Sequence, residues 1–476
     1  MADQTNGFKP SLGLLDATMI VAGSMIGSGI FIVSTEMTTY LGSAGWLIFA
    51  WVLTGFLTLT AAISYGELSS MFPKAGGQYV YLREAFNPLT GFLYGWSLFA
   101  VIQTGTIAAV GVAFSKFAAY IFPSLGPGNI LLDLGITEIS AAEVVSIILV
   151  IVLTYINTKG INGGKIIQTS FTLAKLLSLF GLIVFGFLLA SRADIWNANW
   201  SDAWQAKHMV ASGTGKNFWE NVSGFAIVPL FASALVGSLF SSDAWNNVTF
   251  IAGEIKKPEK NIGLSLFLGT LIVTAIYVSA NLMYLSVLDL NEIATAPDGR
   301  VALAASLKIF GNAGTIVIAV MIMISTFGCN NGLILSGARV YYTMAKDGLF
   351  FKKTATLNKN NVPELALWIQ CVWTCLLCLS GTYNQLLTYV VFVVLIFYVL
   401  TLIGIFRLRK TRPDQERPYK AFGYPVLPLL YCLLALSICA ALFIYQPRQT
   451  WPGALIVLLG IPLYYIAIAG KNKTQE

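Results

Sequence analysis

The sequence predicts an all-α polytopic membrane protein with 12 transmembrane helices. Its 476 residues are 56% hydrophobic and 11% charged, and their mean hydropathy is +0.73. Soluble domains carry about 25% charged residues. The apolar residues gather in runs of about 20, which is long enough to cross the roughly 30 Å hydrocarbon core of a bilayer. Because backbone polar groups in lipid must be bonded within the segment, we expect these runs to be helices.

The 12 expected spans follow one another with short connections. In chain order they cover residues 11–35, 44–71, 86–120, 140–158, 164–190, 223–253, 262–288, 311–345, 364–382, 384–407, 426–445 and 452–470.

The basic residues predict the orientation of these spans. With the N-terminus placed inside the cell, about 21 Lys and Arg fall in inside loops and about 7 in outside loops, in accordance with the positive-inside rule. Both termini are therefore expected to be cytoplasmic in a multi-pass protein of the plasma (cell inner) membrane. The net charge of +7 follows this topology, and no nucleic-acid partner is expected.

Two of the expected spans contain residues that interrupt a helix. The first holds three glycines and two serines within seven residues, Gly23 to Gly29. Small residues also serve close helix packing in membranes, which is the alternative interpretation. The sixth holds Gly237, Ser241, Ser242 and Asp243, and an acidic residue in mid-span is a functional-site candidate.

Interrupted helices at matching places of two halves predict a binding site between inverted repeats. We expect a 5+5 core, in which residues 11–190 form the first repeat and 223–407 the second, followed by two additional helices over 426–470. Amides at the start of a half-helix attract a carboxylate, and carbonyls at the end of another accept from an ammonium. An α-amino acid carries both groups.

Five segments then resemble motifs of the amino acid–polyamine–organocation (APC) superfamily, and the sixth span is most similar to its L-amino-acid transporter (LAT) branch. The resemblance implies a LeuT-like fold and a sodium-independent secondary transporter that moves L-amino acids by alternating access, as an exchanger. These segments are Ile26–Phe31, Phe72–Tyr81, Phe240–Asn246 with Glu254–Glu259, Ala338–Tyr342 with Ala345–Gly348, and Arg412–Pro418.

The resemblance also implies roles for individual residues. Amides near Gly27, Ser28 and Gly29 are expected to hold the substrate carboxylate. Carbonyls near Met25, Phe240, Ser241 and Asp243 are expected to hold the amino group, with the Phe240 ring as a gate. The complete expected substrate site consists of Met25, Ile26, Gly27, Ser28, Gly29, Gln103, Phe240, Ser241, Ser242 and Asp243.

Lys175 lies about ten residues into the fifth span, a rise of about 15 Å. Its ammonium either snorkels to the membrane surface or stays buried. In relatives, a lysine in this helix fills the place where sodium-coupled members bind Na⁺. The resemblance implies bonds from Lys175 to first-span carbonyls and to a hydroxyl of Ser325 or Thr326. A buried lysine also loses its proton readily, so a proton-coupled symporter is the alternative function.

Three polar residues leave their roles open. Asp243 either faces the substrate, where it favours cationic side chains, or bonds neighbouring serines and the unwound backbone. Gln103 and Thr106 lie three residues apart on the third span. They either share a face toward the site or bond a neighbouring helix.

Other classes of membrane protein fit less well. A channel of this size needs repeated subunits with acidic rings or carbonyl ladders, and an enzyme needs clustered His, Asp or Cys within the spans. Neither pattern occurs in the sequence. No catalytic residue, metal site or cofactor is expected, and the chain is not expected to be an enzyme.

In animal LAT-type transporters, a heavy subunit attaches through a disulfide to a cysteine in the outer loop between helices 3 and 4. The six cysteines of this chain all lie in apolar segments, and none lies in 121–139, 191–222, 289–310 or 446–451. We therefore expect a prokaryotic chain that transports alone, without a disulfide-linked partner.

Overall fold

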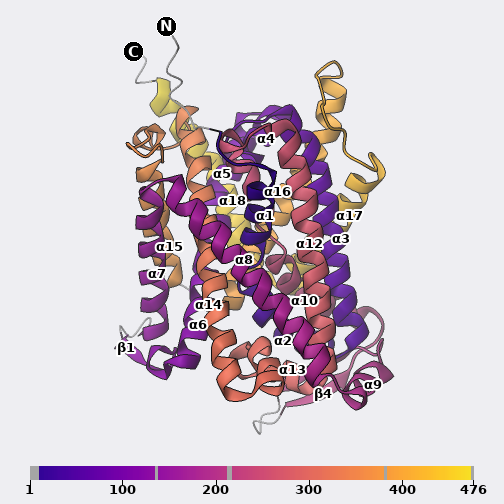
Figure 1. The fold of residues 1–476 in the computed structure, drawn as a ribbon. Coiled ribbons are helices and arrows are strands. Elements are labelled where there is room, and N and C mark those ends of the chain that lie inside the picture. Colours follow the sequence, from indigo (N-terminus) through magenta and orange to yellow (C-terminus); the bar gives the residue numbers. More distant parts are fainter. Residues whose placement is uncertain (1–9, 134–137, 212–216, 380–382, 473–476) are drawn as a thin grey trace.

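The computed structural model describes residues 10–133, 138–211, 217–379 and 383–472. Helices dominate this part of the chain, and two small β-hairpins lie between them (Figure 1). The first-half elements are α1 (Leu14–Met25), α2 (Gly29–Leu41), α3 (Ala44–Met71), α4 (Gln78–Ala85), α5 (Pro88–Ser97), η1 (Leu98–Ile102), α6 (Gln103–Ile121), η2 (Pro123–Leu125), β1 (Ile130–Asp133), β2 (Glu138–Ser140), α7 (Ala141–Thr158), α8 (Ile161–Phe185), η3 (Gly186–Ala190), α9 (Ala193–Ser201), β3 (Lys207–Ala211) and β4 (Asn217–Asn221).

The named elements of the second half are all helices in the described part of the chain. Its elements are η4 (Gly224–Ala226), α10 (Ile227–Ser241), α11 (Asn247–Phe250), η5 (Ala252–Glu254), α12 (Pro258–Val287), α13 (Leu290–Ala294), η6 (Pro297–Gly299), α14 (Val301–Lys346), η7 (Lys352–Ala355), α15 (Glu364–Cys378), α16 (Tyr383–Thr411), α17 (Val426–Tyr445) and α18 (Pro447–Asn472).

Eleven helical segments of the described chain are long and apolar enough to span a membrane. They confirm the all-helical membrane fold. The remaining predicted span, 364–382, corresponds to the shorter apolar helix α15. The predicted start at residue 311 coincides with Gly311, whose φ of 67° interrupts α14.

Local sequence explains where several helices begin and end. α2 ends at Gly42, whose φ of 47° is left-handed, a conformation that glycine adopts readily. Ser43 then caps α3 by accepting from the Trp46 amide. Asn87 caps α5 in the same way, and Pro88 occupies its first position, where no N–H is needed.

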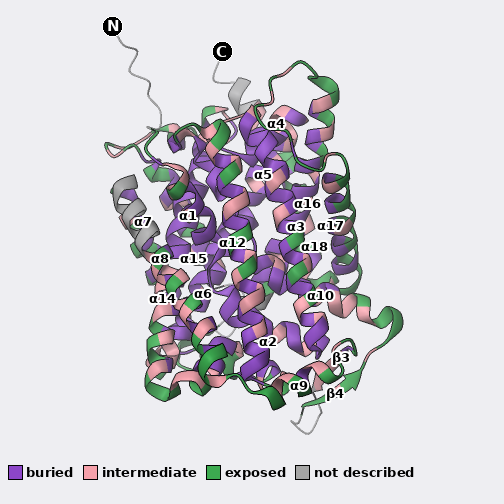
Figure 2. Ribbon diagram, turned by 45° about the vertical axis from the view of Figure 1, so that its right-hand side comes forward, coloured by how far each residue is buried: buried purple, intermediate pink, exposed green. Residues whose placement is uncertain are grey.

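The bundle buries polar residues inside and presents apolar residues outside. Figure 2 shows buried residues filling the interior and exposed residues around the rim. On α17 the exposed residues include Val426, Leu429, Leu433 and Leu436. Their spacing places them on one face of the helix. Such an apolar outer face fits lipid and not water.

The two ends of the bundle differ. One end, here the α4 end, carries α4 and the segment after α16, where Arg412 binds Glu84. The opposite end, here the hairpin end, carries β1–β2, β3–β4 and α13 (Figure 1). The charge distribution predicts that the α4 end is cytoplasmic. Residues 1–9 and 473–476 lie outside the described chain, so the location of both termini stays a prediction.

Candidate functional site

The first predicted interruption is present between α1 and α2. α1 ends at Met25, and the Gly27 amide turns back to the Met25 carbonyl at 2.8 Å. α2 begins at Gly29. The first amides of a helix lack an intrahelical acceptor and carry the positive end of its dipole. The start of α2 is therefore suited to an anion.

The second predicted interruption follows α10. The Ser242 amide bonds the Ser238 carbonyl at 3.0 Å, and the Asp243 amide bonds the Phe240 carbonyl at 3.1 Å. Ala244 then adopts a φ of 63°, which is uncommon for a residue with a Cβ. The chain leaves the helix here, and the end of α10 carries the negative end of its dipole.

The two interruptions lie against each other. A Cβ placed on Gly29 would lie only 2.0 Å from Ser241 Oγ, so glycine is what permits this approach. Tyr277 of α12 joins the two, because its hydroxyl lies 3.0 Å from the carbonyl oxygens of both Met25 and Ser241. The positive start of α2 thus lies beside the negative ends of α1 and α10. This arrangement offers separate places for a carboxylate and an ammonium.

Lys175 lies fully buried beside the first interruption. Its Nζ donates to the carbonyl oxygens of Gly23 at 2.6 Å and Ile26 at 2.7 Å. The side chain therefore does not snorkel to the membrane surface. Ser325 Oγ reaches the same Ile26 carbonyl at 3.4 Å and Gly27 at 3.5 Å.

Thr326, the other residue whose hydroxyl was predicted to bond Lys175, makes different contacts. Thr326 Oγ1 donates to the carbonyls of Ile322 and Met323 in its own helix, at 3.0 Å each. A threonine hydroxyl inside a helix commonly bonds the preceding turn. Among the two candidates, Ser325 is the one whose hydroxyl contacts the first interruption.

Gln103 follows η1, a π-helical turn, which often marks functional places in helices. Its amide nitrogen donates to the Leu333 carbonyl at 2.7 Å and to Ser336 Oγ at 3.4 Å. Thr106 bonds the Ile102 carbonyl of the preceding turn at 2.6 Å. Gln103 therefore bonds α14, and it also lines a small cavity that Asp243 lines.

Asp243 lines two small cavities, the one that it shares with Gln103 and a second one beside Trp245. Its Oδ1 accepts from the Tyr398 hydroxyl at 2.6 Å. The Tyr398 ring packs against Trp245 and Tyr65, with centroids 5.2 and 6.0 Å apart. The carboxylate thus bonds a tyrosine of α16 and also the backbone of Ala244 in the unwound segment.

Several residues of the site were not predicted from the sequence. Tyr277 and Tyr398 contact the interruptions from α12 and α16. Asn246 donates to Gln78 Oε1 at 2.9 Å, and Gln78 donates to Thr401 at 3.0 Å. The signal available in the sequence was the occurrence of polar residues in mid-span. Such a residue does not reveal which helix its side chain contacts.

Ion pairs join the helices at the α4 end. Arg409 binds the buried Glu67 through two bonds of 2.9 and 2.6 Å. Arg83 pairs with Asp347. Burial lowers the pKa of Arg83, but the Asp347 carboxylate and Tyr79 outweigh it, so this pKa lies above its usual value. The Arg83 guanidinium therefore stays charged.

Known proteins match nearly the whole chain. A family model described as amino acid permease matches residues 12–468. The serine/threonine exchanger SteT of Bacillus subtilis is 31% identical over 98% of both chains. Asc-type amino acid transporter 1 of Mus musculus is 28% identical, over 100% of this chain and 84% of its own. Large neutral amino acids transporter small subunit 2 of Homo sapiens is 28% identical, over 98% of this chain and 82% of its own.

Proposed function

Because the chain belongs to the amino acid permease family, we propose that it is a sodium-independent secondary transporter that exchanges L-α-amino acids by alternating access. One observation carries this proposal most directly. The start of α2 adjoins the ends of α1 and α10, as the Gly29 approach to Ser241 and the Tyr277 bridge require. A transporter of this chemistry, and not an enzyme, is what such paired helix ends support.

In this proposal the substrate binds as a zwitterion. Its carboxylate accepts from the amides around Gly27, Ser28 and Gly29, where the dipole of α2 adds attraction. Its ammonium donates to the carbonyls of Met25 and Ser241, at the opposite dipole ends. Each carbonyl oxygen has two lone pairs, so both acceptors retain capacity beside the Tyr277 hydroxyl. Phe240, a buried residue in the last turn of α10, serves as the proposed gate.

The position of Lys175 supports independence from sodium. Its ammonium already donates to the carbonyls of Gly23 and Ile26 within 2.7 Å. A sodium ion requires oxygen ligands at such a place and is repelled by a fixed positive charge. The same buried ammonium is the observation that favours the second candidate, a symporter in which Lys175 exchanges a proton.

The lining of the cavity shared by Gln103 and Asp243 supports neutral amino acids as substrates. Its polar residues are mostly uncharged amides and hydroxyls, among them Gln103, Thr106 and Asn246. The Asp243 carboxylate, already bonded to Tyr398, adds an acceptor for a hydroxyl side chain. We therefore propose small neutral L-amino acids, serine and threonine included.

We also propose that the chain works alone in the plasma membrane with both termini in the cytoplasm. All six cysteines lie within helices. Five are buried and Cys375 is partly buried, so their sulfurs are poorly placed to reach a partner's thiol at the roughly 2 Å of a disulfide.

The test is uptake by the purified single chain in proteoliposomes. Labelled L-serine, L-threonine and L-lysine are supplied outside, with and without an internal amino acid. Exchange predicts that uptake requires the internal amino acid and is unchanged when choline replaces Na⁺. Uptake driven by a pH gradient alone would instead establish the proton symporter. Uptake that appears only after a second polypeptide is added would contradict the single-chain proposal.

A further inference from the structure

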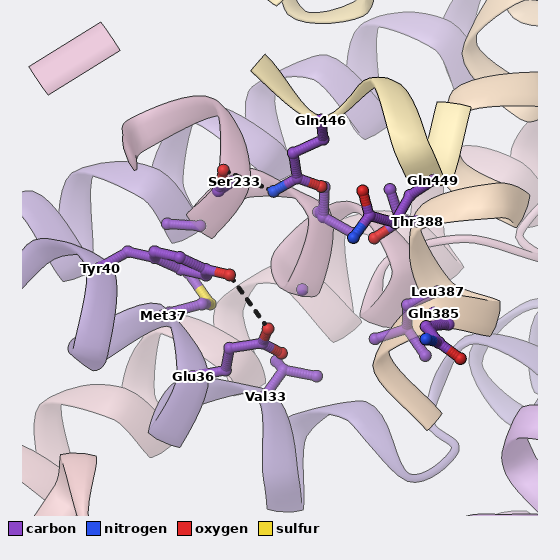
Figure 3. A pocket seen from close by; sticks show the side chains of 13 residues that line it. Val33, Glu36, Met37, Tyr40, Ser233, Gln385, Leu387, Thr388, Gln446 and Gln449 are labelled. Atoms are coloured by element: carbon purple, nitrogen blue, oxygen red, sulfur yellow. Dashed lines mark hydrogen bonds between the residues drawn. The ribbon is translucent and has the colours of Figure 1, made fainter. Parts of the chain in front are cut away.

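A pocket separate from the interruptions opens toward the hairpin end. It encloses about 510 Å³ of empty space, part of which is open solvent. Its walls come from α2, α10, α16 and the junction of α17 with α18. Figure 3 shows the side chains of its 13 lining residues around the open space. Its polar lining residues include Glu36, Tyr40, Ser233, Thr388, Gln446 and Gln449.

Three helices independently place this pocket on the outer side of the interruptions. Glu36 lies seven residues beyond Gly29 on α2, and Ser233 lies eight residues before Ser241 on α10. At 1.5 Å per residue these separations are about 10 and 12 Å. On α16, Leu387 lies 11 residues before Tyr398, a rise of about 16 Å. Each helix therefore leads from the pocket to the proposed substrate site.

The floor of the pocket is closed by a close helix contact. A Cβ on Gly237 of α10 would lie 3.0 Å from Val33 Cβ and 3.3 Å from Met37 Cγ of α2. These two half-helices end at the interruptions. The pocket is thus separated from the proposed substrate site by the packing of the same elements that form it.

Glu36 is the one charged side chain among the residues that line the pocket. The Tyr40 hydroxyl donates to its Oε1 at 3.4 Å (Figure 3). An ionised carboxylate has about four acceptor positions, so this long bond leaves capacity for further donors. Lys116 of α6 interacts with Glu36 electrostatically but does not line the pocket. Glu36 therefore offers the pocket a site for a cationic donor.

The opposite wall offers neutral donors. The Gln446 amide donates one N–H to Ser233 Oγ at 2.6 Å and has a second N–H. Gln449 and Thr388 lie beside it (Figure 3). Amides and hydroxyls bind a carboxylate without adding charge. A ligand that carries both an ammonium and a carboxylate has an acceptor in Glu36 and donors in Gln446 and Gln449.

From this lining we infer that the pocket is an outer subsite for an α-amino acid. Glu36 binds the ammonium group, and Gln446 and Gln449 face the carboxylate. The substrate then passes from this subsite to the interruptions. The inference rests on the proposed function and adds a second binding place to it.

Binding stoichiometry tests this inference. The purified full chain is dialysed to equilibrium against labelled L-serine, with L-threonine and L-leucine in parallel. We expect two molecules per wild-type chain and one per Glu36→Gln chain, whose remaining site keeps its affinity within twofold. The outer site should weaken at least 10-fold, the loss expected for a charge-assisted hydrogen bond. Glu138→Gln changes an exposed residue of β2 at the hairpin end. This control variant should still bind two molecules per chain.

Analogues identify the group that Glu36 binds. Ethanolamine, which lacks the carboxylate of serine, should displace serine from the outer site of the wild type, whereas 3-hydroxypropionate, which lacks the amine, should not. One serine per wild-type chain, or two retained by Glu36→Gln, would overturn the subsite. Loss of both sites in Glu36→Gln would show a structural role and overturn it as well. Absence of binding of all three amino acids to the wild type would instead overturn the proposed function.

Discussion

The side-chain nitrogen of Lys175 lies 2.7 Å from the carbonyl oxygen of Ile26, the residue at which α1 gives way to the first interruption. The same nitrogen lies 2.6 Å from the Gly23 carbonyl. A helix end that is opened for a substrate leaves carbonyls without their usual donors. Lys175 supplies a donor to two of them and thereby fixes the shape of the opening.

We expect Lys175→Ala to reduce amino-acid exchange at least about 10-fold. The change leaves two buried carbonyl oxygens without this donor, at a cost of about 1–3 kcal/mol each. Exchange in proteoliposomes and thermal unfolding in detergent measure the two effects. Lys308→Ala, which removes an exposed lysine paired with Glu292, should leave both nearly unchanged. A steep Na⁺ dependence of the wild type would contradict the role given to Lys175.

Analogues of the substrate should reveal the zwitterion site. Removing the α-amino or the α-carboxyl group loses a charge-assisted hydrogen bond worth about 1.5–3 kcal/mol, or roughly 10- to 150-fold in affinity. Competition against labelled L-serine bound to Glu36→Gln, which lacks the proposed outer subsite, measures this loss at the interruptions alone. Methylation or extension of the side chain serves as a control that keeps both groups. Equal inhibition by serine and its decarboxylated amine would refute the arrangement.

Tyr277→Phe should separate positioning from packing. The phenyl ring keeps the contact with Trp51, whose ring centroid lies 5.3 Å away, but the hydroxyl between Met25 and Ser241 is lost. We expect about 1 kcal/mol of lost stability and a severalfold change in the KM or rate of exchange. Tyr284→Phe, which loses a longer bond of 3.3 Å to Ile30, should change exchange less. Identical kinetics in Tyr277→Phe and wild type would argue against a positioning role.

Gly29→Ala should abolish exchange by separating α2 from α10. The added carbon would lie 2.6 Å from Ser241 Cβ and 2.9 Å from its Cα, so backbone must move. Overpacking of this kind costs about 1–3 kcal/mol. Gly128→Ala is the matched control, because nothing lies within 4 Å of its added carbon. Wild-type exchange by Gly29→Ala would show that the close approach is not required.

Glu254→Gln should destabilise the fold by about 3–5 kcal/mol, because it leaves the charge of a buried partner uncompensated. Arg339 Nε binds Glu254 Oε1 at 3.1 Å, and both side chains are fully buried. Thermal unfolding in detergent measures the change. Asp194→Asn, in the exposed pair with Arg192, should leave the unfolding temperature unchanged. A similar response of the two variants would mean that burial adds nothing to the Glu254 pair.

Much of the architecture was predictable because its causes are local. Apolar runs predicted the spans, and the glycines and serines around Gly27 and Asp243 predicted where two helices stop. Span α15 was predicted at 364–382, and the structure gives a 15-residue helix. The division into two repeats, 11–190 and 223–407, stays a prediction.

The sequence by itself determined that this chain is a helical membrane protein, and it predicted the two interrupted helices and a deeply placed Lys175, because run length and residue type act within one segment. Only the tertiary structure decided the partners. Tyr277 bonds residues 252 and 36 positions away, and Tyr398 bonds Asp243 across 155 positions. A hydroxyl in mid-span has several helices within reach, and the packing of all of them selects its acceptor.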